Sequence, residues 1–79
     1  MENKIAIMGI IVKDNKSAEC INSFLHDYSK YVIGRMGLPY RTKGVYVISI
    51  ALDAPYEIVE ELAKKIEGVD GVSVRTLYA

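Results

Sequence analysis

Two segments of nine residues, KIAIMGIIV at 4–12 and VYVISIALD at 45–53, carry apolar side chains at odd and even positions alike. Successive side chains of a strand point to opposite faces of its sheet, so both segments predict strands that are covered on both faces. Strands of this kind belong at the centre of a sheet, and we expect the two to lie side by side. Gly9, inside the first segment, predicts a bulge or a close approach of another backbone.

An amphipathic helix is predicted after the first strand, from Ser17 to about Lys30. Apolar residues recur there at spacings of three and four, which is the pattern of a helix packed on a sheet. These positions are Ala18, Ile21, Leu25 and Tyr28. The side chain of Asp14, Asn15 or Ser17 is expected to cap the first turn by accepting a hydrogen bond from a free backbone N–H.

A second helix is expected to begin at Asp53 and Pro55 and to run to about Glu67. Its buried stripe is formed by Ile58, Val59, Leu62 and Ile66. Gly68 follows directly, and we expect it to end the helix in the left-handed conformation.

Two further strands complete the pattern. Residues 31–37 predict a short edge strand, because the segment contains Gly34 and Gly37 and is followed by Pro39. Residues 71–78 predict a last strand with one dry face. The order β-α-β-β-α-β predicts an α+β, ferredoxin-like fold with a four-stranded antiparallel sheet and two helices on one face. We expect residues 1–79 to form a single domain.

The surplus of apolar surface predicts self-association. Two helices cover only one face of such a sheet, whereas both central strands are apolar on both faces. Hydrophobic residues make up 51 % of the chain, which is more apolar surface than 79 residues bury comfortably. We therefore expect a homo-oligomer, a dimer or a tetramer, joined through the sheet or edge to edge. The alternative is a monomer whose sheet exposes some Val and Ala.

The charge pattern and the apolar runs exclude several kinds of partner. Ten basic residues balance ten acidic ones and are scattered, so we expect no direct binding of nucleic acid. No apolar run approaches the roughly 20 residues that cross a bilayer, so we expect no membrane contact. The start of the chain lacks the features of a secretory signal, and the lone Cys20 forms no internal disulfide. A cytoplasmic location is expected.

Catalytic and metal-binding constellations are not found. Cys20 and His26 are six residues apart on the predicted helix, about 240° around its axis, so they do not form a nucleophile and base pair. No carboxylate pair and no glycine-rich phosphate loop occurs. One His and one Cys cannot complete a metal site within one chain, although a site shared across a subunit interface remains an alternative. We expect no enzyme activity, no metal and no cofactor.

The residues with the most binding chemistry lie around the predicted second strand. His26 stands near the end of the predicted helix, where it either binds a ligand or caps the helix. Arg35 interrupts an apolar strand and Arg41 stands in a loop. Either guanidinium can grip a carboxylate or phosphate, or pair with an acidic residue of a neighbouring subunit. Gly37 and Pro39 shape the intervening turn. The candidate ligand-binding residues are therefore His26, Arg35, Gly37, Pro39 and Arg41.

Three short motifs carry a resemblance to a known family. They are LHDYS at 25–29, R-x-G-x-P at 35–39 and GVDGVSVRT at 68–76. In these motifs, and over nearly all of its length, the chain resembles the iron-only hydrogenase system regulators. The resemblance implies a ferredoxin-like fold, similar to ACT domains and to the C-terminal domain of the nickel-responsive regulator, and an oligomeric assembly. It also implies a role in the hydrogenase system.

The chain departs from those two related groups at definite positions. Nickel-responsive regulators join such a domain to a DNA-binding segment and bind metal through several His and a Cys. Here the first strand begins at residue 4 and a single His is present, so we expect no DNA-binding segment and no nickel site. Amino-acid-binding ACT domains have an Asp-x-Pro-Gly loop after the first strand, whereas this chain has VKDNKSAE at 12–19.

The sequence and the resemblance together predict a small oligomeric regulatory domain linked to the iron-only hydrogenase system. Its partner is expected to be a small-molecule effector or a regulatory protein. An effector is expected to bind at a subunit interface near His26, Arg35 and Arg41. The alternative is an assembly module that holds a protein partner and senses nothing.

Overall fold

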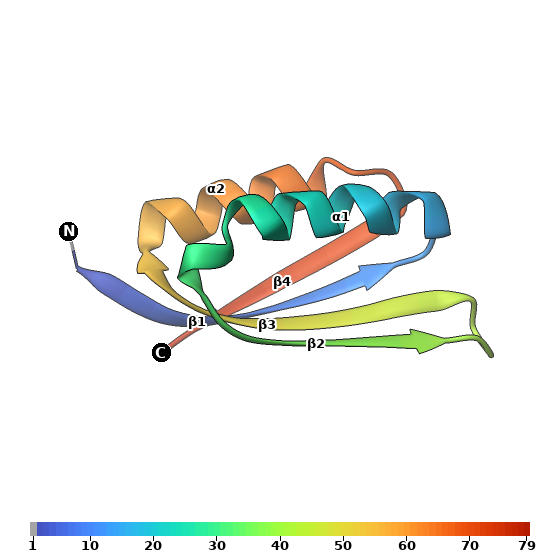
Figure 1. Cartoon of the computed structure of the whole chain (residues 1–79), viewed down its shortest axis with the longest axis horizontal. Coiled ribbons are helices and arrows are strands. Elements are labelled where there is room, and N and C mark those ends of the chain that lie inside the picture. Colours follow the sequence, from blue (N-terminus) through green and yellow to red (C-terminus); the bar gives the residue numbers. More distant parts are fainter. Residues whose placement is uncertain (1) are drawn as a thin grey trace.

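The computed structural model describes residues 2–79 and contains one four-stranded sheet, two α-helices and a short 3-10 helix (Figure 1). In chain order the elements are β1 (Asn3–Val12), α1 (Asn15–Asp27), η1 (Ser29–Tyr31), β2 (Val32–Tyr40), β3 (Val45–Pro55), α2 (Tyr56–Glu67) and β4 (Val72–Tyr78). The β-α-β-β-α-β order predicted from the sequence is confirmed.

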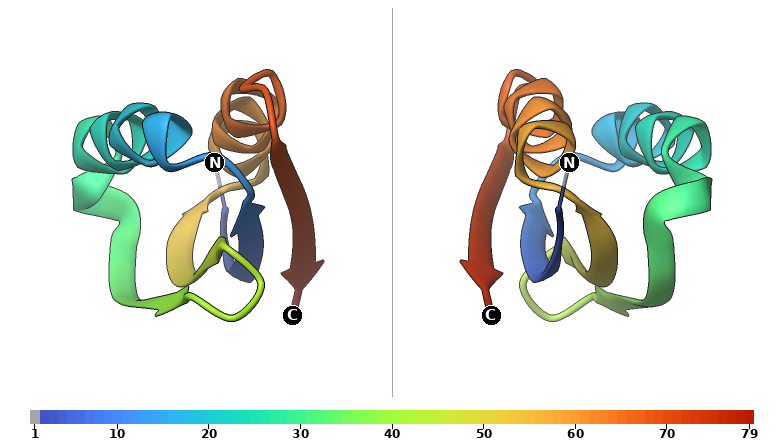
Figure 2. Two further views of the ribbon diagram at one scale, coloured as in Figure 1. Left: turned by 90° about the vertical axis from the view of Figure 1, so that its right-hand side faces the viewer. Right: turned by 90° about the vertical axis from the view of Figure 1, so that its left-hand side faces the viewer.

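The four strands are ordered β2-β3-β1-β4, and every neighbouring pair is antiparallel. The two strands with apolar residues at both parities, β1 and β3, therefore lie side by side at the centre, as predicted. Seen along the sheet in Figure 2, α1 and α2 lie on the same side of the sheet. The predicted α+β, ferredoxin-like fold is confirmed.

The core lies between the two helices and one face of the sheet. Its buried residues alternate along β1 and β3 and recur every third or fourth residue on the helices. The fully buried set includes Met8, Ile10, Ile21, Ile48, Ile50, Leu52, Val59, Leu62 and Ile66. Ser17 is the buried polar residue in residues 2–79, and its Oγ donates a hydrogen bond of 2.9 Å to the carbonyl oxygen of Asp70.

The opposite face of the sheet is bare and apolar. Residues that alternate with the core positions of the strands point away from the helices, and six large ones on β1, β2 and β4 are about half exposed or more. We call the surface formed by Ile5, Ile7, Met36, Leu38, Tyr40 and Leu77 the open sheet face. No element in residues 2–79 covers it, and Figure 2 shows both helices on the other side.

The edge strand β2 is longer than predicted. It extends to Tyr40, three residues beyond the expected end, and its pairing with β3 continues through Pro39 and Tyr40. Pro39 is tolerated there because an edge strand has one side without ladder partners. Tyr31, expected to begin the strand, is the last residue of η1 instead, and a register shift between Val32 and Gly34 marks a bulge in β2.

Two glycines differ from their predicted roles. Gly68 ends α2 with φ −73°, in the right-handed region, whereas Gly71 has φ 75° and forms the left-handed turn before β4. Gly9 forms no bulge, because the pairing of β1 with β3 runs through it without a shift, and no atom lies within 4 Å of its missing Cβ position.

The helix boundaries also shift by a few residues. Asp14 caps α1, since its side chain accepts a hydrogen bond of 3.0 Å from the backbone N–H of Lys16. The helix ends at Asp27, earlier than expected. Asp53 belongs to β3, which runs to Pro55 before α2 begins. Neither α-helix of the described chain is long and apolar enough to cross a membrane.

Candidate functional site

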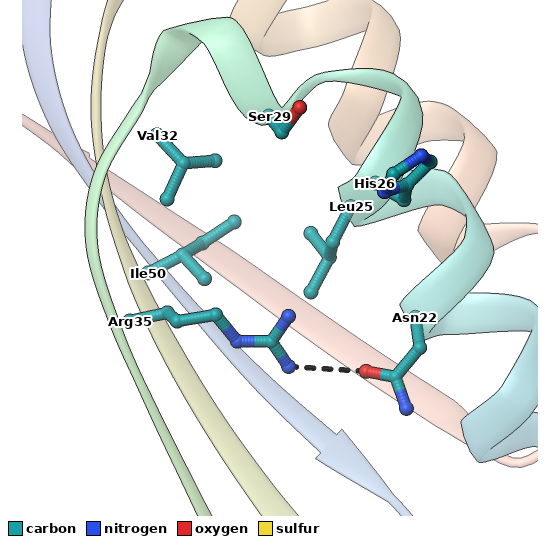
Figure 3. A pocket seen from close by; sticks show the side chains of 7 residues that line it. All are labelled: Asn22, Leu25, His26, Ser29, Val32, Arg35 and Ile50. Atoms are coloured by element: carbon teal, nitrogen blue, oxygen red, sulfur yellow. Dashed lines mark hydrogen bonds between the residues drawn. The ribbon is translucent and has the colours of Figure 1, made fainter.

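A pocket of about 360 Å³ lies between the last two turns of α1, η1 and the first half of β2 (Figure 3). It is lined by Asn22, Leu25, His26, Ser29, Val32, Arg35 and Ile50. We call it the α1–β2 pocket. Two of the five candidate ligand-binding residues, His26 and Arg35, meet here although they are nine positions apart in the chain.

The α1–β2 pocket has an apolar floor and a polar rim. Leu25 and Ile50 are buried at its base, and Val32 closes one side. The four polar side chains that line it are exposed: Asn22, His26, Ser29 and Arg35. Such a combination of apolar walls and a few convergent polar groups is typical of small-molecule sites.

Strand pairing directs Arg35 toward the helices. Arg35 is the partner of Ile50 in the β2–β3 ladder, and residues paired in this way project from the same face of a sheet. Because Ile50 points into the core, Arg35 leaves the sheet on the helix side. Its side chain crosses one end of the pocket, and Nη2 donates a hydrogen bond of 3.0 Å to Oδ1 of Asn22 (Figure 3).

The end of α1 shapes the opposite side of the pocket. The backbone N–H of Tyr28 donates to the carbonyl oxygen of Phe24 at 3.2 Å and closes the helix. The chain then makes the tight turn of η1, in which the N–H of Tyr31 donates to the carbonyl oxygen of Tyr28 at 3.0 Å. After this turn the backbone continues into β2, and Ser29 lies above the pocket (Figure 3).

The other three candidate residues lie elsewhere. Pro39 and Arg41 line a second hollow of about 440 Å³ at the β2–β3 turn, near the start of α1. Gly37 lines neither hollow. A Cβ at Gly37 would lie 2.8 Å from Oη of Tyr46, so this glycine makes room for the tyrosine side chain. Within one chain the five residues therefore do not line one pocket.

Several residues of the α1–β2 pocket are not predicted from the sequence. Asn22 lies one helical turn before His26, and its position could have been found from the helical period. Val32 and Ile50 carry no such signal, because their place in the pocket depends on the bulge and on the pairing of β2 with β3.

The polar groups of the pocket can hold a ligand. Asn22, His26, Ser29 and Arg35 together supply mainly hydrogen-bond donors. Cys20 is exposed on α1, outside the pocket. In residues 2–79 no group of three or more His, Cys, Asp or Glu side chains could hold a metal ion. The expected lack of enzyme activity and of metal stays a prediction.

A separate polar contact joins α2 to the edge strand β4. The Tyr78 hydroxyl donates a short hydrogen bond to Oε2 of Glu60, and the Tyr78 ring lies 5.1 Å from the ring of Tyr56. Burial raises the pKa of Tyr78 above its usual range, and the hydrogen bond to Glu60 raises it further. This contact is far from the α1–β2 pocket in the sheet order and serves to hold β4 against α2.

Known structures share this architecture. The structure of the uncharacterized protein TM1266 from Thermotoga maritima matches with a TM-score of 0.94 and 27 % sequence identity, over 98 % of both chains. A formyltetrahydrofolate deformylase from Pseudomonas putida KT2440 matches with a TM-score of 0.67 and 15 % identity. That match covers 92 % of this chain and 28 % of the deformylase, and it shows the shared fold alone.

A comparison of the sequence with protein families identifies the family of this chain. No curated protein sequence matches the chain. Residues 4–76 match the TM1266-like family, described as "Iron-only hydrogenase system regulator, putative". Because this match spans nearly the whole chain, the protein belongs to the TM1266-like family of iron-only hydrogenase system regulators.

Proposed function

We propose that the chain is an effector-sensing regulatory domain of the iron-only hydrogenase system, that it acts in the cytoplasm as a homo-oligomer, and that it binds no DNA itself. Membership of the regulator family supports the assignment to that system. The observation that carries the sensing role is the α1–β2 pocket, where an apolar floor meets four polar side chains.

The dimensions of the α1–β2 pocket suit a small effector. Ligand sites commonly enclose about 300–1,000 Å³, and this pocket, at about 360 Å³, lies at the small end of that range. Its walls come from a helix end, a 3-10 turn and an edge strand, so a ligand would contact three elements at once. Binding there would favour one relative position of α1 and β2 over others, which is how an effector alters a regulator.

The open sheet face supports a homo-oligomer. Its six large side chains are 47–67 % exposed. Together they leave on the order of 600 Å² of apolar surface in water, which is as much as the largest patch of a typical monomer and close to the roughly 800 Å² that each partner buries in a stable interface. A second copy supplies a matching apolar surface, and a dimer or a tetramer would cover it.

The charge balance supports a role through protein partners. The formal net charge is zero, and the sequence has no basic cluster of the kind that phosphate backbones require. A regulator without its own DNA contact acts by binding another protein of the system. The effector and the oligomer would then set which surface is offered to that partner.

A thermal shift screen tests the sensing role. The purified chain is heated with each compound of a small-molecule panel, and its unfolding temperature is recorded. A true effector at 100 times its Kd adds about 2.7 kcal/mol of stability, which raises Tm by about 10–20 °C in a domain of this size. The shift should disappear in Arg35→Gln and persist in Arg41→Gln. A panel without any shift beyond a degree would contradict the sensing role.

The alternative function is a protein assembly module, and the open sheet face favours it. In that case a partner protein covers the six apolar residues and the α1–β2 pocket is incidental. Leu38→Gln would then abolish regulation in cells, whereas Arg35→Gln would leave it intact. The sensing role predicts that both variants lose regulation.

A further inference from the structure

We infer that the α1–β2 pocket takes a small organic monocarboxylate, with the carboxylate on Arg35 and the apolar part on Leu25, Val32 and Ile50. This inference rests on the proposed sensing function and names the chemical class of its effector.

The charge at the rim selects an anion. Arg35 carries a permanent positive charge, and none of the seven lining residues, all within the described chain, is acidic. The side-chain hydrogen bond that Arg35 donates within residues 2–79 goes to the neutral amide of Asn22. The guanidinium at the pocket mouth therefore has a hydrogen-bond acceptor but no counter-charge, and a bound anion would supply one.

The geometry of the Arg35–Asn22 contact leaves room for a carboxylate. A guanidinium presents five N–H donors in a planar fork, and a single bond from Nη2 reaches Asn22. A carboxylate binds such a fork through two parallel hydrogen bonds, which are stronger than a bond to a neutral amide oxygen. The amide of Asn22 also has an NH₂ group, which can donate to the same carboxylate once the amide turns.

The floor selects an apolar body of limited size. Leu25 and Ile50 are 3 % and 1 % exposed, and Val32 is half-buried beside them. Figure 3 shows these three side chains between Arg35 at one end of the pocket and Ser29 at the other. A ligand whose carboxylate sits at Arg35 therefore lays its carbon chain along apolar side chains. The volume of about 360 Å³ suits a short chain rather than a nucleotide.

The position of the pocket disfavours a phosphate. Phosphates bind best at helix N-termini, where several backbone N–H groups and the positive end of the helix dipole point at them. The α1–β2 pocket lies at the C-terminal end of α1, which carries the negative end of the dipole. One arginine beside that helix end matches a single negative charge better than the two of a phosphate.

The test compares hexanoate with hexanamide, which has the same chain without the charge. Binding is measured by NMR titration of the ¹⁵N-labelled chain, with inorganic phosphate and hexylammonium as further probes. Hexanoate should bind about 10- to 100-fold more tightly than hexanamide, which is the effect of a charge-assisted hydrogen bond. Phosphate and hexylammonium should bind more weakly than hexanoate.

Three arginine variants localise the effect. Arg35→Gln should bring the hexanoate-to-hexanamide ratio to about one, whereas Arg35→Lys should keep part of it because the charge remains. Arg75→Gln is the matched control: Arg75 lies on another strand, outside the pocket, and its Nη1 donates to the backbone carbonyl of Val74. It should leave the ratio unchanged. A ratio that survives Arg35→Gln would overturn the placement of the carboxylate.

The outcomes separate this inference from the proposed function. Equal affinities for hexanoate and hexanamide in the pocket, or tighter binding of phosphate, would overturn the monocarboxylate and leave the sensing role standing. If none of the four probes shifts a pocket signal, the monocarboxylate is refuted. The sensing role is refuted as well only if the wider panel also leaves Tm unchanged.

Discussion

Replacing Leu38 by Gln on the open sheet face should weaken the homo-oligomer without unfolding the protomer. Leu38 is 53 % exposed in the single chain. Burying a whole leucine side chain contributes about 1.5–3 kcal/mol, so covering the exposed half contributes about 0.8–1.6 kcal/mol per protomer. A two-fold dimer buries two copies, and their loss raises the dimer Kd about 15- to 200-fold.

Sedimentation equilibrium at protein concentrations from about 1 to 100 μM measures this change. Wild type should be a dimer or a tetramer across most of that range, and Leu38→Gln should dissociate within it. Lys43→Gln places the same side chain in the β2–β3 turn, away from the open sheet face, and should associate like wild type. The reasoning fails if wild type is monomeric, or if Leu38→Gln associates as tightly as wild type.

Three further predictions concern the fold. Gly71→Ala should lower the stability by about 1 kcal/mol, because φ 75° is strained for alanine, whereas Gly68→Ala at φ −73° should be neutral or stabilising; urea unfolding that finds the two equal would contradict this. Ser17→Ala should lower Tm by about 4–8 °C through loss of its buried hydrogen bond, and an unchanged Tm would count against that bond. The raised pKa of Tyr78 means that the folded state holds this proton more tightly than the unfolded state, so stability should fall as the pH rises above about 10. In Tyr78→Phe this loss of stability with rising pH should be smaller, and urea unfolding at several pH values measures it. An equal loss in both proteins would contradict the prediction.

The centre of the fold could be predicted because its signals are local. Segments 4–12 and 45–53 are apolar at odd and even positions alike, and this pattern is typical of strands at the centre of a sheet. The limits of the elements depend on tertiary contacts instead. The apolar period of α1 continues to Tyr28 although the helix ends before it, and β2 is extended by its ladder with β3.

The prediction of a left-handed Gly68 is wrong for the same reason: the conformation depends on a tertiary contact. Gly68 and Gly71 both follow α2 closely, and either could end the helix in the left-handed conformation. In the structure the helix ends at Gly68 in the right-handed region, and the left-handed conformation falls at Gly71, whose carbonyl oxygen accepts a hydrogen bond of 2.8 Å from the backbone N–H of Lys13. That contact joins the start of β4 to the end of β1, and a single helix pattern does not reveal it.

The candidate site could be predicted only in part. The side-chain chemistry of His26 and Arg35 marks them as candidates, and the structure brings them to one pocket because the pairing of Arg35 with Ile50 turns the arginine toward α1. Arg41 has the same chemistry, yet it lies beyond the end of β2 and lines a different hollow. Strand register and the position of the bulge determine which arginine lies at the α1–β2 pocket. Composition and spacing predict neither the register nor the bulge.

The location of the effector site is tested most directly by ¹H–¹⁵N NMR spectra of the chain with the compounds that raise its Tm. Our account predicts that the largest shifts fall on the backbone amides of Asn22, His26, Ser29 and Arg35, and that they vanish in Arg35→Gln. Shifts centred on Arg41 at the β2–β3 turn, or spread over the open sheet face, would contradict it.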